Sequence, residues 1–488
     1  ISIFFSNFFF FSDVMKTLDS YLVVIIFVIS FLIRIWNISI PDCVVFDEFH
    51  FGQFINDYIH QDFFFDIHPP FGKLLYFLFA KFTCYDGSLS FEKPNSQYSN
   101  DFFVFFRIIP AILASFVPEF IYMILRNSSI SIISSFFTSL FITFEMSIIS
   151  QSRFILIEGI QHFFICFHLL ILTFTKNLGI IGVSLGFSIS IKLTSFSLLP
   201  FTFSYIFISN VQHQKNKNIF ESIRHTFINV IIIFFIAFVV FISLTMIHLN
   251  LLKNVTNDAY EFLPDNLFND IFTNKTGISY FIQLFKNSMQ ITFLMNEINQ
   301  KNKQIHPYSD SPLNWPLLTG IWVGMWSDES NNRQVNCIGN FFVYFFSFLG
   351  LIKRLFQIIE FVSKSCNDKK KLIDHFLNMK INVASFSFFG WIFSYFPFFL
   401  VKRTLFLYHY QISLIFAVIN FGFVTSNSII SGICLLLSLF GFCYWKPLLY
   451  GTFLTENELK EKVWIRRWRY GNIHHQKLIE SFFEDFQF

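Results

Sequence analysis

The sequence predicts an all-α polytopic membrane protein with about eleven transmembrane helices and lumenal loops that bear short juxtamembrane helices. Of its 488 residues, 54% are hydrophobic and only 14% are charged, whereas about 25% are charged in a typical soluble domain. Apolar runs of about 20 residues, the length that a helix needs to cross the hydrocarbon, recur along most of the chain. These observations exclude an ordinary soluble protein and make the lipid bilayer the first expected partner.

The expected spans follow one another with short connections. They lie near residues 21–40, 103–125, 130–149, 154–175, 178–194, 195–211, 226–250, 337–352, 381–400, 404–424 and 427–449. The first is too long for a signal peptide and is interpreted as a membrane anchor. The stretch 178–211 is interpreted as two short helices around Lys192, because a backbone break at membrane depth is tolerated only inside protein or beside water.

Basic residues in the connecting loops predict the orientation. Lys and Arg concentrate in the loops 212–225 and 353–380, and cytosolic loops carry the excess of these residues. With eleven spans, both loops and the N-terminus are then cytosolic, and the loops after the first and seventh spans lie on the opposite side. The tail also falls on that side, although Arg466, Arg467 and Arg469 fit it poorly.

These predictions divide the chain into five parts. They are a cytosolic N-terminal segment (1–20), an N-terminal transmembrane catalytic module (21–250) that includes a first lumenal loop (41–102), a large lumenal loop (251–336), C-terminal transmembrane helices (337–451) and a tail (452–488).

Charge and cysteine content limit the functional classes. A formal net charge of +3 is too small for a nucleic-acid-binding protein of this length. The seven cysteines show neither CxxC spacing nor a Cys/His pattern, so we expect no metal site and no cofactor. Two of Cys43, Cys84 and Cys337 could form a disulfide in an oxidising lumen.

Ionisable residues at span ends are costly in lipid unless they face protein or water. In the eleven-span topology, six of them fall at or near lumenal ends: Arg34, Arg107, Arg153, Glu158, Lys192 and Arg403. Snorkelling to the nearest interface would explain any one of these residues. Six on one side suggest instead that they converge on a site.

The first lumenal loop carries two unusual blocks. Residues 47–52 read DEFHFG, with Asp47 and Glu48 adjacent, and residues 66–73 read DIHPPFGK, in which two prolines fix a turn before a helix. Adjacent acids are common on solvated loops. A carboxylate held at the membrane face could also act as a general base toward a hydroxyl group.

These two blocks together resemble the first lumenal loop of the dolichyl-phosphate-mannose protein O-mannosyltransferases (glycosyltransferase family 39). The resemblance continues in order to residue 451. Its further motifs are RIIPA at 107–111, QSRFIL at 151–156, SIK at 190–192, HPYS at 306–309, NWPL at 314–317, GW at 390–391, YFPF at 395–398, Arg403, FLYHY at 406–410 and PLLYG at 447–451.

The resemblance implies a GT-C glycosyltransferase fold in the endoplasmic reticulum membrane, with the active site facing the lumen. Such an enzyme transfers mannose from dolichyl phosphate mannose to Ser or Thr of proteins, with inversion at the sugar carbon. Asp47 matches the family's presumed general base, and Glu48 matches a second acid that helps to position substrates. A homodimer or a heterodimer with a paralogue is a further possible partnership.

Cations are needed to stabilise the departing phosphate, and Arg or Lys suits that role. We expect Arg107 and Lys192 to bind the donor phosphate, followed by Arg153 and Arg403. A structural ion pair with Glu119 or Glu158 is the alternative for these cations.

Four further residues are expected to position substrates. They are His68, Trp315, Tyr408 and His409. A lone histidine is more often structural, and Trp or Tyr is also common in interfacial belts, where Tyr410 would belong too.

The sequence departs from the family at two places. About 85 residues between 250 and 336 cannot hold the lumenal trefoil (MIR) domain of eukaryotic members, so we expect a form without it. Glu158 stands where the family more often has Asp.

Three other functions compete with protein O-mannosylation. One is a GT-C enzyme with another acceptor, such as Trp for C-mannosylation, a lipid or a glycan. Another is a non-catalytic subunit of an O-mannosyltransferase complex. A transporter is disfavoured because the sequence shows no internal repeat.

Overall fold

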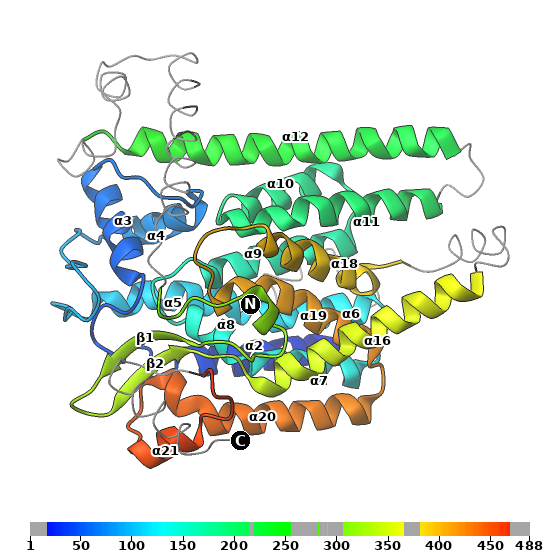
Figure 1. The fold of residues 1–488 in the computed structure, drawn as a ribbon. Helices are drawn as coiled ribbons and strands as arrows, with labels where there is room; N and C mark the ends of the chain where they lie inside the picture. The colour runs from blue at the N-terminus through cyan, green and yellow to red at the C-terminus, as the bar shows by residue number, and fades with distance from the viewer. Residues whose placement is uncertain are drawn as a thin grey trace.

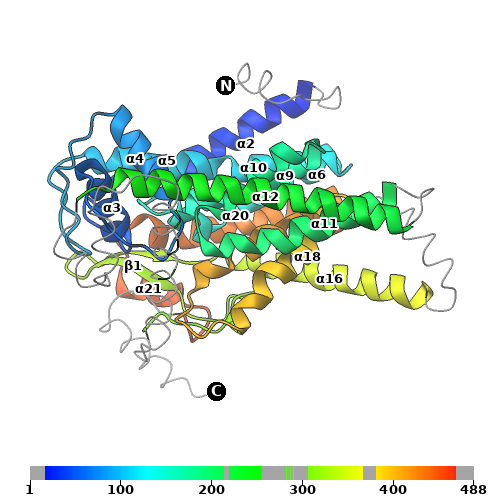
Figure 2. The same cartoon turned by 90° about the horizontal axis from the view of Figure 1, so that it is seen from above.

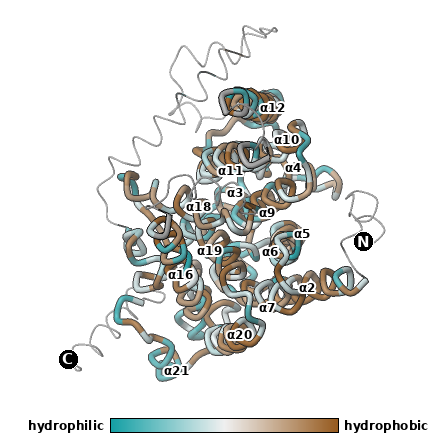
Figure 3. The backbone as a smooth tube through the Cα atoms, turned by 90° about the vertical axis from the view of Figure 1, so that its right-hand side faces the viewer, coloured by the Kyte–Doolittle hydropathy of each residue, from teal (hydrophilic) through white to brown (hydrophobic). Residues whose placement is uncertain are grey.

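The long apolar helices lie side by side in one bundle, as a computed structural model of the chain shows (Figure 1). The structure describes residues 17–213, 219–254, 306–365 and 381–468, together with 282, 286 and 290. Viewed end-on, hydrophobic residues alternate with stretches of more polar ones along the helices of the bundle (Figure 3). The described part of the chain is mainly helical, as the sequence predicts, with one small β-hairpin in addition.

The N-terminal half contributes most of the bundle. Its helices are α2 (Thr17–Ile35), α3 (Glu48–His60), α4 (Phe71–Phe82), α5 (Phe102–Ser115), α6 (Val117–Asn127), α7 (Ile132–Thr143), α8 (Met146–Gln151), α9 (Glu158–Phe174), α10 (Leu178–Ile189), the 3-10 turn η1 (Leu193–Ser197), α11 (Leu198–His213) and α12 (Ile219–Leu251).

In the described residues of the second half, the hairpin is joined by α-helices and short 3-10 helices. Its elements are η2 (Pro312–Asn314), β1 (Val323–Asp328), β2 (Arg333–Cys337), α16 (Phe341–Ser365), α18 (Val383–Tyr395), η3 (Phe396–Phe399), η4 (Leu407–Tyr410), α19 (Gln411–Val424), α20 (Ser428–Tyr450) and α21 (Glu456–Glu461). Strands β1 and β2 pair antiparallel, with Val323 opposite Cys337 and a bulge between Gly324 and Trp326.

Short polar residues start several of these helices. The side chains of Ser131, Asn177 and Asn427 accept hydrogen bonds from backbone N–H groups in the first turns of α7, α10 and α20. Asn382 forms a capping box with Ser385 at the start of α18. These caps satisfy N–H groups that have no partner within the helix, and they divide a nearly continuous apolar sequence into separate helices.

Helix α19 lies in the centre of the bundle, and α2, α12, α16 and α20 lie outside it with exposed apolar faces. Helices α10 and α12 approach closely because α10 presents two glycines. A Cβ on Gly182 would lie 2.7 Å from the Cβ of Ile236, and one on Gly186 would lie 2.6 Å from the Cβ of Val240. This close packing holds α12 against the rest of the fold.

Each predicted span contains a helix. Six described helical segments are long and apolar enough to cross a membrane: Thr17–Ile35, Phe102–Asn127, Ile223–Leu251, Phe341–Ser363, Leu407–Val424 and Ser428–Tyr450. Four shorter apolar ones have 10–17 residues, and a helix of 12 residues is only about 18 Å long, against about 30 Å of hydrocarbon. The count of eleven spans therefore stays a prediction, while Lys192 does separate two helices, α10 and α11.

The loops and short elements gather at one end of the bundle, which we call the loop end. It holds α3, α4, the hairpin and α21 (Figures 1 and 2). The end of α11, the start of α12 and the end of α16, which border the two basic loops in the sequence, lie at the opposite end. The structure thus separates the segments that the sequence assigns to opposite sides of the membrane.

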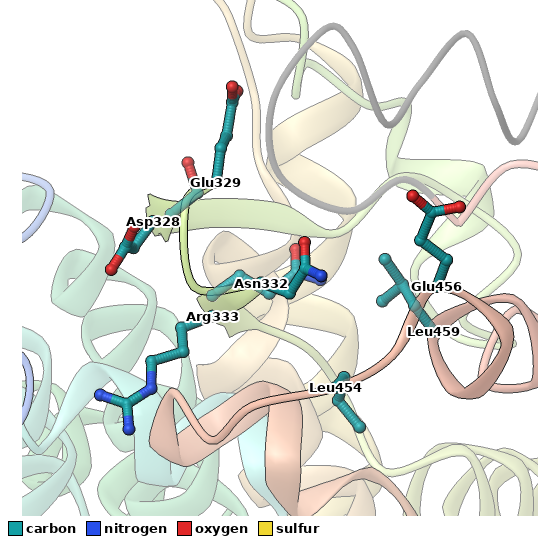
Figure 4. Close-up of a pocket in the computed structure, with 9 residues that line it drawn as sticks. Asp328, Glu329, Asn332, Arg333, Leu454, Glu456 and Leu459 are labelled. Atoms are coloured by element: carbon teal, nitrogen blue, oxygen red, sulfur yellow. The ribbon is translucent and has the colours of Figure 1, made fainter.

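The tail packs at the loop end. The ring of Trp468 lies 4.2 Å from that of Trp322, and its Nε1 donates to the carbonyl of Leu318 at 2.7 Å. Helix α21 packs beside the hairpin, where Asn332 accepts a hydrogen bond from the backbone of Leu454 (Figure 4). The described tail residues, 452–468, therefore lie at the same end of the bundle as the first loop.

The cysteines do not form the predicted disulfide. Cys43, Cys84 and Cys337 are all free thiols, and Cys43 and Cys337 are buried.

The large loop between α12 and residue 306 lies mostly outside the described residues, so the expectation of a missing trefoil domain concerns residues that the structure does not describe.

Candidate active site

Asp47 is the residue before α3, and its carboxylate makes no hydrogen bond with the described residues. The preceding Phe46 has a φ of +50°, a left-handed conformation that bulky residues rarely adopt and that often marks a functional site. The Phe46 ring packs edge-on against Tyr408, with 6.1 Å between ring centroids. Asp47 is thus held at the loop end with its acid group available.

The neighbouring acid, Glu48, has the opposite environment. It is fully buried and forms an ion pair with Arg107 of α5, with Nε–Oε1 and Nη2–Oε2 distances of 2.8 and 2.7 Å. Its oxygens also accept hydrogen bonds from the backbone of Val45 and Ile155 and from the hydroxyl of Tyr98. Glu48 therefore joins the first loop to α5 and to the segment before α9.

Arg107 has no N–H group left for a substrate. Its remaining hydrogen bonds go to the carbonyls of Ile38, Pro41 and Cys43, so all five N–H groups of the guanidinium are used. We therefore do not retain Arg107 as a phosphate ligand, and we assign it to the support of the loop.

Arg153 is also committed to the scaffold. Its guanidinium donates to the carbonyls of Arg34, Trp36 and Asn37, at and just beyond the end of α2, and lies 4.5 Å from the centre of the Tyr450 ring. A cation in this position satisfies terminal carbonyls and the negative end of the helix dipole. Arg153 is 1% exposed, so we also remove it from the phosphate ligands.

Lys192 forms an ion pair with Glu158, the first residue of α9. Its Nζ lies 2.5 Å from Oε1 of Glu158 and 5.3 Å from the centre of the Tyr408 ring. The alternative of a structural ion pair is thus realised for Lys192. An ammonium group has three N–H donors, so the pair does not use up its capacity to bind an anion.

Arg403 is partly exposed in the segment before η4. Its guanidinium makes no hydrogen bond or ion pair with the residues that the structure describes. Its charge nevertheless lies close enough to His68, Tyr408 and His409 to influence their protonation. Of the four predicted cations, Arg403 is the one with all its donors open.

The second sequence block, residues 66–73, contributes an ion pair and a histidine to the site. Lys73, at the start of α4, forms an ion pair with Asp66 and donates to the carbonyl of His68 at 2.9 Å. Burial lowers the pKa of His68 to about 3, so its ring is neutral at physiological pH. The Nδ1 atom of His68 is buried without a partner among the described residues, and it can therefore bond to a ligand.

The surroundings of Asp47 bring its pKa close to neutral pH. Burial, and to a smaller extent the negative charge of Glu158, raises the pKa of Asp47 to about 7, while Lys192 acts in the opposite direction. A general base works best with a pKa near the operating pH. The environment thus suits Asp47 for accepting a proton at neutral pH.

An apolar cavity of about 730 Å³ opens beside these groups. Its polar end is formed by Asp66, His68 and Lys73, and its walls come from η1 and from helices α10, α11 and α12. The wall residues include Ile189, Leu193, Phe196, Leu199, Phe234, Ala237, Phe238 and Phe241. This volume is typical of ligand sites.

A second pocket, between the hairpin and α21 (Figure 4), has room for about one water molecule.

The predicted positioning residues divide into two groups. Tyr408 and His409 lie at the site, near Lys192 and Arg403. Trp315 is fully buried, and its ring packs against Phe398, His409 and Tyr410 at centroid distances of 5.4 to 6.4 Å. Because no surface of Trp315 is accessible, we reassign it to the support of His409.

Sequence reasoning missed several residues of the site. Tyr98 and Phe46 gave no signal, because single aromatic residues are uninformative in so Phe-rich a chain. Asp66 and Lys73 lay within a recognised block but were not singled out, although opposite charges on either side of a Pro-Pro turn suggest an ion pair.

Among the described residues, no three His, Cys, Asp or Glu side chains are placed to hold a metal ion.

Comparisons with known proteins identify the family of the chain. Residues 24–253 match the family described as dolichyl-phosphate-mannose-protein mannosyltransferase, and residues 284–468 match the C-terminal four-transmembrane region of protein O-mannosyltransferase. The chain belongs to the protein O-mannosyltransferase family. Its two family segments meet at the loop end, with Asp47 and Lys192 from the first and Arg403 and Tyr408 from the second.

Individual relatives match over shorter stretches. Dolichyl-phosphate-mannose–protein mannosyltransferase 4 of Schizosaccharomyces pombe is 38% identical over 138 residues, 28% of this chain and 18% of that protein. Mannosyltransferase 2 of Candida albicans is 25% identical over 269 residues, 51% of this chain and 35% of that protein. The matched region is thus well under two thirds of the length of these relatives.

A solved structure shows the same fold over nearly the whole chain. It is the Saccharomyces cerevisiae protein O-mannosyltransferase Pmt1-Pmt2 complex bound to the sugar donor, with a TM-score of 0.79, 16% identity and 95% coverage of both chains. The prediction of a polytopic helical membrane fold of the GT-C type is confirmed.

Proposed function

We propose that this protein transfers mannose from dolichyl phosphate mannose to Ser and Thr hydroxyls of secretory-pathway proteins, with inversion at the sugar carbon. The observation that carries the proposal is the unpartnered Asp47 carboxylate, whose charge interacts with those of Lys192, Glu158 and Asp66, the last of which lies at the polar end of the apolar cavity. Membership of the protein O-mannosyltransferase family supports the choice of donor and acceptor.

In the proposed reaction, Asp47 accepts the proton of the acceptor hydroxyl while its oxygen attacks the anomeric carbon of mannose. The bond between that carbon and the phosphate oxygen breaks, and dolichyl phosphate departs with the bonding electron pair. Attack from the side opposite the phosphate inverts the configuration. Lys192 and Arg403 stabilise the negative charge that develops on the phosphate.

The remaining residues support this arrangement. Glu48, Arg107 and Arg153 fix the first loop to the bundle. His68, Tyr408 and His409 line the space between cations and cavity, where they position substrates. The apolar cavity receives the first part of the dolichyl chain, so that the phosphate lies at its polar end.

The proposal extends to place and partners. The loop end faces the lumen of the endoplasmic reticulum, where acceptor proteins enter, and the basic loops at the other end face the cytosol. A homodimer or a heterodimer with a paralogue is part of this proposal, since the solved relative of the same fold is a complex of two such chains.

A reconstituted transfer assay tests the function. The purified chain is placed in liposomes containing dolichyl phosphate mannose, alone and with a paralogue, and hexose on a Ser/Thr peptide is measured by mass spectrometry. We expect transfer by the wild type and none by Asp47→Ala. The matched control is Asp42→Ala, an exposed acid of the same loop, which should keep full activity.

Two results would count against the proposal. Transfer by Asp47→Ala at the wild-type rate would refute the base assignment. Absence of wild-type transfer, with and without the paralogue, would refute the mannosyltransferase function, and hexose on Trp instead of Ser or Thr would refute the acceptor.

A further inference from the structure

We propose that Glu158 is a sugar-binding residue that also holds the phosphate-binding Lys192, so that one carboxylate links the two ends of the donor headgroup. This inference rests on the proposed function above and adds a specificity-determining contact to it. Glu158 is the first residue of α9, and it is 6% exposed.

The two oxygens of Glu158 have different surroundings. Oε1 accepts a hydrogen bond from Lys192 Nζ at 2.5 Å. Oε2 is buried and has no partner among the described residues. A buried carboxylate oxygen without a donor loses its hydration without compensation, and buried polar atoms of this kind call for a ligand or an ordered water.

The other carboxylates near Lys192 are already in use. Glu48 accepts five hydrogen bonds from Arg107, Tyr98 and the backbone. Asp66 is paired with Lys73. Since Asp47 must receive the proton of the acceptor, Oε2 of Glu158 is the remaining buried carboxylate oxygen in this part of the described structure that can accept a hydrogen bond.

A sugar is a ligand that can donate a hydrogen bond to Oε2 of Glu158. Its hydroxyl groups are hydrogen-bond donors, and a bond to an ionised acceptor is about twice as strong as a neutral one. Glu158 also lies close enough to Asp47 for its charge to raise the pKa of that base. A hydroxyl bound to Oε2 would therefore sit between the phosphate cation and the base, where the mannose ring must lie for transfer.

The link through Lys192 explains why one residue serves both purposes. Lys192 gives one N–H to Glu158 and keeps two for phosphate oxygens. Sugar and phosphate are then held by one rigid pair, and the anomeric carbon between them is oriented toward Asp47. A residue that only anchored Lys192 would affect lipids with and without a sugar equally.

Binding of two lipids separates these roles. Wild type and Glu158→Gln, both in lipid nanodiscs, are titrated with dolichyl phosphate mannose and with dolichyl phosphate, which lacks the sugar. We expect Glu158→Gln to lower the preference for the mannosylated lipid about tenfold. Glu158→Asp, which keeps the charge, should retain most of the preference.

Two further variants make the result specific. Lys192→Met should weaken binding of both lipids, because both carry the phosphate. Glu119→Gln, the same substitution at a buried acid of α6, should leave both affinities unchanged, because the ion pair of Lys192 is with Glu158 and not with Glu119.

The inference is overturned if Glu158→Gln weakens both lipids equally, since Glu158 would then only hold Lys192. It is overturned as well if the wild type binds both lipids with the same affinity. A wild type that binds neither lipid and transfers no mannose refutes the proposed function itself, so the two failures are distinguishable.

Discussion

Replacing either partner of the Glu48–Arg107 ion pair should unfold the active-site loop, whereas replacing Asp47 should leave it folded. Both members of the pair are fully buried. Removing one partner of a buried pair leaves an uncompensated charge and costs about 3–5 kcal/mol. We therefore expect Glu48→Leu and Arg107→Met each to lose at least that much stability.

The double variant Glu48→Leu/Arg107→Met tests the reasoning further. It removes both charges, but six hydrogen bonds to other groups disappear as well, three accepted by Glu48 and three donated by Arg107. Those groups become buried without partners, at about 1–3 kcal/mol each where no water reaches them. The double variant should therefore stay destabilised, but by less than the two single variants together, because these lose the same six bonds and each also leaves one buried charge unpaired.

Thermal unfolding in detergent, followed by intrinsic fluorescence, measures these effects. One kcal/mol shifts Tm by about 2–4 °C in a protein of 150–250 residues, and by roughly half that in a chain twice as long, so each single variant should lose roughly 3–10 °C. Asp47→Asn, the matched control, should unfold within about 1 °C of the wild type and lack activity. A Glu48→Leu variant with wild-type Tm but no transfer would refute the scaffold assignment and make Glu48 a substrate contact.

Three further predictions concern Asp47, Arg403 and the cavity. Because a general base must be ionised and the pKa of Asp47 is raised to about 7, kcat/KM should rise with pH through a midpoint near 7, and Glu158→Gln should move that midpoint downward; a flat profile would contradict this. Arg403→Gln should raise the donor KM and weaken inhibition by dolichyl phosphate at unchanged Tm, and unaltered inhibition would exclude a phosphate contact. Leu199→Trp, which narrows the cavity, should raise the donor KM in the liposome assay, whereas Phe203→Trp on the exposed side of the same helix should not; equal effects would mean that the cavity does not bind the donor.

The apolar helices could be predicted because their signals are local. A run of apolar residues determines a membrane helix from composition alone, and each predicted span contains a helix. The two short helices around Lys192 were also predictable, since a charged residue within an apolar run needs a protein or water environment. The hairpin from Val323 to Cys337 could not be predicted, because its strands, VGMWSD and RQVNC, each contain a single β-branched residue and so resemble a loop in composition.

The roles of the cations could not be predicted, because they depend on partners that are distant in sequence. Arg107 and Glu48 are 59 residues apart, and Lys192 and Glu158 are 34 residues apart. Position near a span end indicates that a cation needs a partner, but it does not say whether the partner is a protein acid, a helix end or a substrate. Only the fold distinguishes Arg107, whose donors are all used, and Arg153, which is buried against carbonyls at the end of α2, from Arg403.

The contrast between the adjacent acids Asp47 and Glu48 explains how the site stays both rigid and reactive. Glu48 is the first residue of α3 and is fully buried, whereas Asp47 precedes the helix and makes no hydrogen bond with the described residues. Glu48 and Arg107 satisfy each other completely and fix the loop, which allows Asp47 to remain without a partner at a defined position. A catalytic group must be held within about 0.5 Å of its working geometry by neighbours that are themselves locked. The buried pair meets that requirement, so a loss of activity on mutation of Glu48 is better explained by displacement of Asp47 than by loss of a second catalytic acid.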